Sequence, residues 1–224
     1  MLRTTLSIIV VATLALIPAE TRSAANLGTV EGKIRVTKGG KAKSNHGSIV
    51  VYLEGVPTAA AAGIDRKHAI RQKDIQFAPR VSVIVKGTTV DFPNEDKVFH
   101  NVFSMSRPAR FDLGLYRSGS SKSVQFKREG VVDVFCNIHP EMSSKVLVVP
   151  TTFFATTDAS GKFRIDGVPA GTYPIVVWQP YGEGQRGQVK IEAGKAAAVT
   201  FDVAEGERPK QHRRKDGTPY GRYE

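Results

Sequence analysis

The chain has 224 residues, of which 32 are lysine or arginine, 21 are aspartate or glutamate and one is cysteine, giving a formal net charge of +11. This length allows one large domain or two small ones with a real apolar core, and the composition, 41% hydrophobic and 24% charged, excludes a disordered chain. One cysteine excludes an intramolecular disulfide framework and any zinc or iron–sulfur site that needs four cysteines.

The N-terminal segment, residues 1–25, is predicted to be a secretory signal peptide. A short basic head that ends at Arg3 precedes an apolar run, Leu6–Ile17, which is too short for a membrane span of roughly 20 residues. Ser23 and Ala25 then offer a small-residue cleavage site. We therefore expect an exported protein, periplasmic if bacterial, without a stable membrane anchor.

The remaining chain alternates apolar and polar residues with a period of two and has no long helical pattern. Turn signals such as Lys38–Gly40 and Asp158–Gly161 separate the runs. Many short strands at regular spacing predict an all-β protein of β-sandwich architecture. In chain order, the expected strands are Gly28–Val36, Ser48–Gly55, Val81–Val85, Thr89–Phe92, Phe99–Ser104, Ser123–Phe126, Val131–Cys136, Lys145–Val149, Phe153–Thr157, Lys162–Ile165, Tyr173–Trp178, Gln188–Ile191 and Ala197–Val203.

Two segments do not fit the strand pattern. Thr58–Gly63 contains four consecutive alanines and is interpreted as a linker. Glu205–Glu224 has almost no aliphatic side chains, and we expect a basic disordered tail there. Most of the basic excess lies outside this tail, on the folded surface, so we expect association with an acidic partner.

The lone cysteine belongs to a group of metal-binding residue types. Strand alternation turns Cys136 inward; His139 and Met142 follow closely, and His100 lies on a separate upstream strand. Two imidazoles, one thiolate and a distant thioether form the ligand set of a blue-copper electron-transfer site. Pro140 stiffens the loop that carries His139. The sequence therefore predicts one copper ion held by His100, Cys136, His139 and Met142.

The spacing Cys136-x-x-His139-Pro140-x-Met142 resembles the short copper loop of the amicyanin type among the plastocyanin-type cupredoxins. The similarity covers roughly residues 66–150 and includes the strand with His100 and Asn101. It implies a Greek-key β-sandwich with a type 1 copper site. It further implies that the two histidines and the cysteine are trigonal ligands, that the methionine is the weak axial ligand, and that Asn101 hydrogen-bonds to the cysteine loop.

The resemblance also implies that the exposed edge of His139 is the path for electrons. Glu141 departs from the family pattern, because the surface around this histidine is typically apolar.

Other metal and catalytic sites fit the residue counts less well. A binuclear copper centre needs a second bridging thiolate, and a multicopper oxidase needs paired histidines in His-x-His motifs, which the sequence lacks. A Cys–His hydrolase and a structural zinc site would both leave Met142 unexplained. Alternation places Met105 on the face opposite His100. We expect three further histidines to be solvated: His46, His68 and His212.

The segments on either side of the copper-loop region resemble a carboxypeptidase regulatory-like domain, a small transthyretin-like β-sandwich. The C-terminal part, residues 151–204, is small for an independent sandwich. Our hypothesis is a discontinuous domain made of residues 27–57 and 151–204, with a cupredoxin domain over residues 66–150 inserted between its halves. Such domains are typically non-catalytic.

The sequence favours an exported electron carrier that is not an enzyme. Its expected partner is a redox protein, such as a periplasmic dehydrogenase or a cytochrome, with an acidic docking surface. Nucleic acid is not expected, because the chain has no aromatic-interleaved basic patch and is expected to be exported. A periplasmic copper-binding or delivery protein and a cell-envelope scaffold with incidental copper remain as alternatives.

Overall fold

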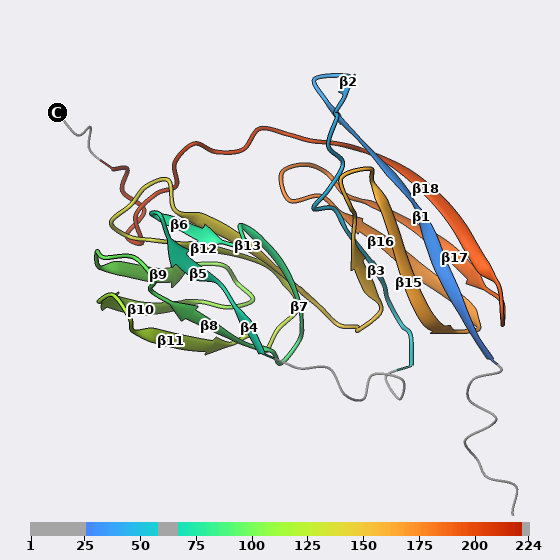
Figure 1. Ribbon diagram of the computed structural model, residues 1–224, viewed down its shortest axis with the longest axis horizontal. Helices are drawn as coiled ribbons and strands as arrows, with labels where there is room; N and C mark the ends of the chain where they lie inside the picture. The colour runs from blue at the N-terminus through green and yellow to red at the C-terminus, as the bar shows by residue number, and fades with distance from the viewer. Residues whose placement is uncertain (1–25, 58–66, 221–224) are drawn as a thin grey trace, which may run out of the picture.

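The computed structural model describes residues 26–57 and 67–220; the predicted signal peptide and the predicted Thr58–Gly63 linker lie outside these residues. The described chain is built from strands, and the predicted all-β architecture of two β-sandwiches is confirmed (Figure 1). No described helix is long and apolar enough to cross a membrane. The strands are β1 (Leu27–Lys38), β2 (Lys41–Ala42), β3 (Val50–Leu53), β4 (Lys67–Ala69), β5 (Arg71–Lys73), β6 (Gln76–Ala78), β7 (Val81–Val85), β8 (Thr89–Pro93), β9 (His100–Ser104), β10 (Phe111–Tyr116), β11 (Ser121–Gln125), β12 (Gly130–Phe135), β13 (Ser143–Val149), β14 (Phe154–Thr156), β15 (Lys162–Pro169), β16 (Gly171–Trp178), β17 (Gln185–Ile191) and β18 (Ala196–Ala204).

One sandwich, which we call the flanking sandwich, is built from strands that precede and follow the central part of the chain. One sheet has the order β15-β1-β18 with β2 beside β1, and the other has the order β14-β3-β16-β17. The N-terminal β1 pairs with β15 on one side and, in parallel, with β18 on the other. Strands from before and after the central part of the chain therefore share each sheet, while the discontinuous domain itself stays a prediction.

The flanking sandwich has its own apolar core. Ile34 of β1, Leu53 of β3 and Ile175 of β16 are each fully buried in one cluster. This burial follows from the alternation of β1, in which Val30, Ile34 and Val36 point inward while charged residues lie between them. The exact domain boundaries stay a prediction, but this core draws on residues before and after the central part of the chain.

The second body, here called the central sandwich, comprises β4 to β13. Its larger sheet has the order β10-β9-β12-β13-β7 and its smaller sheet has the order β11-β8-β4, with a β5–β6 hairpin beside them. Phe92, Val102, Phe126 and Val134 are fully buried in its core. Because β9 and β12 are neighbours in the larger sheet, with Phe103 opposite Phe135, the start of β9 and the end of β12 meet at one end of the sandwich.

A third apolar cluster joins the two sandwiches. Val50 of β3 is buried together with Leu147 and Val149 of β13, and Trp178 of β16 packs against them. The two bodies therefore contact each other through side chains rather than through the chain connections alone.

Candidate metal centre

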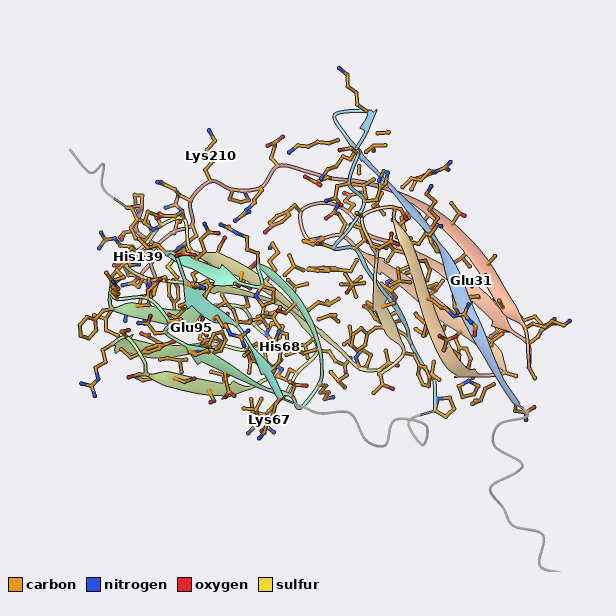
Figure 2. All side chains as sticks on the ribbon, viewed as in Figure 1. Glu31, Lys67, His68, Glu95, His139 and Lys210 are labelled. Atoms are coloured by element: carbon orange, nitrogen blue, oxygen red, sulfur yellow. The ribbon has the colours of Figure 1, made fainter. Side chains whose placement is uncertain are left out.

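The ligand residues come together where strands of the central sandwich end. His100 is the first residue of β9, and Cys136 directly follows β12. His139 and Met142 lie on the connection from β12 to β13. Antiparallel pairing of β9 with β12 places all four at one end of the sandwich, where Figure 2 labels His139.

Three of the four predicted ligands form a close group. The ligand atoms of His100, Cys136 and His139 all lie within 4.8 Å of one another. The two Nδ1 atoms are 3.1 Å apart, and the Cys136 Sγ is 3.6 Å from Nδ1 of His139 and 4.0 Å from Nδ1 of His100. These separations permit bonds of about 2.0–2.3 Å from each donor to a single ion.

The hydrogen bond of His100 fixes which ring nitrogen is available. Its Nε2 lies 2.7 Å from Oδ2 of Asp96, and an ionised carboxylate can only accept a hydrogen bond. Nε2 therefore carries a proton in the neutral ring, and the lone pair is on Nδ1, which faces His139 and Cys136. Asp96 holds this tautomer in the way that carboxylates orient metal-binding histidines.

The four predicted ligands differ in their exposure to solvent. His100, Cys136 and Met142 have no exposed surface, whereas His139 is partly exposed. The Met142 side chain packs in the same apolar cluster as Cys136, and its N–H donates to the carbonyl oxygen of His139 at 3.2 Å. The role of Met142 as the axial ligand stays a prediction.

The electrostatics of the metal-free site favour neutral donor groups. Burial raises the pKa of the Cys136 thiol, while hydrogen bonds from the backbone N–H groups of Asn101, Ile138 and His139 oppose that rise. Burial lowers the pKa of His139 and favours its neutral form. The metal-free site therefore offers a thiol, whose deprotonated form already has backbone donors, and a neutral imidazole.

Asp96 itself is kept ionised. Burial would raise the pKa of its carboxyl group, but hydrogen bonds from His100 and from the N–H groups of Ile75 and Asp74 lower it overall. The Asp74 and Ile75 N–H groups lie 2.6 and 3.0 Å from the carboxylate oxygens. Asn94, which is buried, accepts from the Asp96 N–H at 3.0 Å and shapes this turn. The carboxylate thus reaches His100 from a well-anchored loop.

Asn101 links the cysteine loop to the neighbouring strand. Its Oδ1 accepts from the N–H of Asn137 at 3.2 Å, and its Nδ2 donates to Oδ1 of Asp112 at 2.7 Å. The side chain therefore lies across the start of the loop, in the place that the family resemblance implies.

The structure corrects the expectations for the remaining histidines. His46 accepts a hydrogen bond from the N–H of Val36 at 2.9 Å, and His68 lies 2.9 Å from the hydroxyl of Ser82. His212 stacks on Phe135, with ring centroids 4.4 Å apart and planes at 21°. All three are partly buried rather than solvated, because each ring finds a polar or aromatic partner in the fold.

The expected disorder of the C-terminal tail is also wrong for its described part. Glu205–Tyr220 runs from β18 to the loop that carries Cys136 and His139 (Figure 1). The N–H of His212 donates to the carbonyl oxygen of Pro140 at 3.1 Å. Few aliphatic residues are needed here, because hydrogen bonds and aromatic contacts hold the segment.

Comparison with known proteins supports the predicted resemblance to a carboxypeptidase regulatory-like domain. A family model, the carboxypeptidase regulatory-like domain, matches residues 142–204. The match takes in β13 to β18 and lies within the C-terminal part of the chain, so it leaves β1 and β3 outside. No curated protein matches the chain.

Solved structures similar to this chain include cupredoxins. A purple cupredoxin from Nitrosopumilus maritimus is 26% identical over 37% of this chain and 99% of its own, with a TM-score of 0.33. A mutant of amicyanin in the Cu(I) form is 22% identical over 44% of this chain and 98% of its own, with a TM-score of 0.36. A copper-containing nitrite reductase from Thermus scotoductus SA-01 is 26% identical over 37% of this chain but only 22% of its own, also with a TM-score of 0.36. At such TM-scores the assignment of a metal site rests on the contacts of His100, Cys136 and His139.

Proposed function

We propose that the protein is an exported copper protein that carries single electrons between redox partners through one type 1 site. The observation that carries the proposal is the convergence of two imidazole Nδ1 atoms and one thiol at a buried end of the central sandwich. Two histidines, one cysteine and a weak axial methionine are the donors of blue-copper sites. Copper held there would supply a Cu(I)/Cu(II) couple that exchanges one electron.

The protein's own residues have separate tasks in this proposal. Cys136 and His100 hold their donor atoms away from water, and Asp96 orients the His100 ring. His139 combines a donor atom inside the group with a partly exposed ring. Electrons would enter and leave at this ring, and we assign no catalytic residue because the carrier needs no bound substrate.

The surface near the site favours a protein partner. Val98 and Phe99, directly before His100, are 45% and 57% exposed, and apolar side chains beside a site can form part of a protein contact surface. The net charge of +11 favours an acidic docking face on the partner, with association faster at low salt. We propose a periplasmic dehydrogenase or a cytochrome as the partner class.

Voltammetry of the copper-loaded protein tests electron transfer against copper delivery. A carrier should give a reversible one-electron wave and keep its copper through repeated cycles. A protein that delivers copper should instead release Cu(I) readily to a chelator and show no reversible wave, and that result would reject the carrier.

The Asp96→Asn variant should weaken copper binding by about 10–100-fold, the usual cost of losing an outer partner of a metal-binding histidine. An amide oxygen accepts the Nε2–H less strongly than a carboxylate. Competition against a coloured Cu(I) chelator would measure the change. Asp91→Asn on β8 is a matched control, since its carboxylate accepts from Ser123 rather than from a ligand. Equal affinities of both variants would contradict the role of Asp96.

A further inference from the structure

The C-terminal segment lies directly over the connection from β12 to β13, which carries Cys136, His139 and Met142 and is here called the ligand loop. After β18, Glu205 is anchored near β1, where its N–H donates to Thr37 and its carboxylate pairs with Lys43. The chain then crosses to the central sandwich; Figure 2 labels Lys210 on this crossing and His139 near its end. We call residues 208–220 the C-terminal strap.

The strap makes polar contacts with four residues of the loop. The Tyr220 hydroxyl donates to the carbonyl oxygen of Cys136 at 2.8 Å, and the N–H of Lys215 donates to Oδ1 of Asn137 at 2.9 Å. His212 contacts two further carbonyl oxygens: its Nε2 lies 3.2 Å from that of His139, and its N–H lies 3.1 Å from that of Pro140. Two of these loop residues are candidate copper ligands.

Aromatic contacts fix the strap on the strand that leads into the loop. The His212 ring stacks on Phe135, meets Phe103 edge-on at 6.1 Å and meets Tyr220 edge-on at 5.4 Å. The Arg214 guanidinium lies 5.0 Å from the centre of the Tyr220 ring. This cluster covers the apolar end of β12, whose next residue is Cys136.

An ion pair joins the strap to Asp112, which also forms a hydrogen bond with Asn101. Nζ of Lys215 lies 2.6 Å from Oδ2 of Asp112, whose other oxygen accepts from Asn101. Hydrogen bonds from Lys215, Gly114 and Asn101 lower the pKa of Asp112 against the effect of burial. Asn101 and Lys215 also contact Asn137, so the start of the ligand loop is held from both sides.

We infer that the C-terminal strap is a positioning element of the metal centre, with Tyr220 and His212 as its positioning residues. A loop open to water samples local openings more often than one whose polar groups are bonded. By bonding the loop carbonyls, the strap keeps the cysteine and histidine donors in place before metal binds. The effect on copper rests on the proposed function, but the effect on the metal-free loop does not.

The reactivity of the lone thiol tests the inference without any metal. Cys136 is the chain's one cysteine and is fully buried, so an aromatic disulfide reagent reports on how often the loop opens. We expect Tyr220→Phe to raise the reaction rate of the metal-free protein by about fivefold, the cost of one hydrogen bond. A chain that ends at Glu207, which keeps the Glu205 and Glu207 ion pairs with Lys38, should react at least about tenfold faster.

Tyr173→Phe provides the matched control. Tyr173 lies in the flanking sandwich, and its hydroxyl also donates to a backbone carbonyl, that of Ala170 at 3.5 Å. This variant should react at the rate of the unchanged protein. If Tyr220→Phe also reacts within about twofold of that rate, the inference is overturned, whatever happens to the shortened chain.

Copper release provides the second readout. Transfer of Cu(I) to a chelator should be about 10–100-fold faster from the shortened chain than from the unchanged protein. If the unchanged protein binds no copper, the proposed function fails, while the thiol rates still decide the role of the strap. If copper binds but leaves both proteins equally fast, the positioning role is rejected.

Discussion

The Cys136→Ser variant is expected to lose more than about 100-fold in Cu(I) affinity, because losing even an outer partner of a ligand costs about 10–100-fold. A thiolate is a soft donor that Cu(I) prefers, whereas a serine hydroxyl is hard and stays protonated. No other thiol in the chain can replace it. Competition against a chelator of known affinity would measure the loss.

Val134→Ser is the matched control for this substitution. Val134 is fully buried and lies two residues before Cys136, on the same face of the chain. The Val134→Ser substitution therefore places a hydroxyl in the same core but leaves the thiol intact. This variant should be less stable but should keep its copper affinity within about tenfold. Equal losses in both variants would mean that the core, rather than the thiol, governs binding.

The Ile34→Ala variant is expected to destabilise the flanking sandwich by about 2–5 kcal/mol, the usual cost of emptying a fully buried aliphatic site. Ile34 lies on β1, between β15 and β18, and packs in one core with Ile175. Urea unfolding followed by fluorescence would measure the change, because the chain's single tryptophan, Trp178, lies on β16 of this sandwich.

Ile75→Ala is the control for this stability experiment. Ile75 lies between β5 and β6 and is 39% exposed, so its loss should cost less than about 1 kcal/mol. If Ile34→Ala is equally mild, the N-terminal strand does not complete the flanking core, and the discontinuous domain is wrong.

The sequence revealed most strands because their alternation was regular. β7, Val81–Val85, was expected with the same ends, and β1 and β16 were each expected within two residues. In these strands a buried face with Val, Ile and Tyr alternates with a more exposed face, which is what a half-buried sheet requires.

The strands that were missed lack this regularity. β10 contains Gly114 at φ +65°, and its pairing with β9 shifts between Asp112 and Leu115, so a bulge interrupts the alternation. β5 and β6 have three residues each, and the inward residue of β5 is Gln72. A buried glutamine gives no apolar signal in the sequence. Its burial becomes understandable only in the fold, where its Nε2 donates to the carbonyl oxygen of Phe92.

Parts of the site were also invisible in the sequence. The types and spacing of Cys136 and His139 pointed to a metal, since few other functions use them together. The carboxylate of Asp96 gave no such signal. Asp96 precedes His100 by four residues, and the two side chains meet only because the turn between them folds back. The strap was missed because its contacts lie more than 70 residues away in sequence, as that from His212 to His139 shows.

The absorption spectrum of the protein loaded with one equivalent of Cu(II) tests the central claim most directly. We expect an intense visible band from charge transfer between the Cys136 thiolate and Cu(II), as in sites with two histidines and one cysteine. The band should be absent from Cys136→Ser and present in the Val134→Ser control. Bound Cu(II) without this band, or a band that survives in Cys136→Ser, would contradict a blue-copper site at His100, Cys136 and His139.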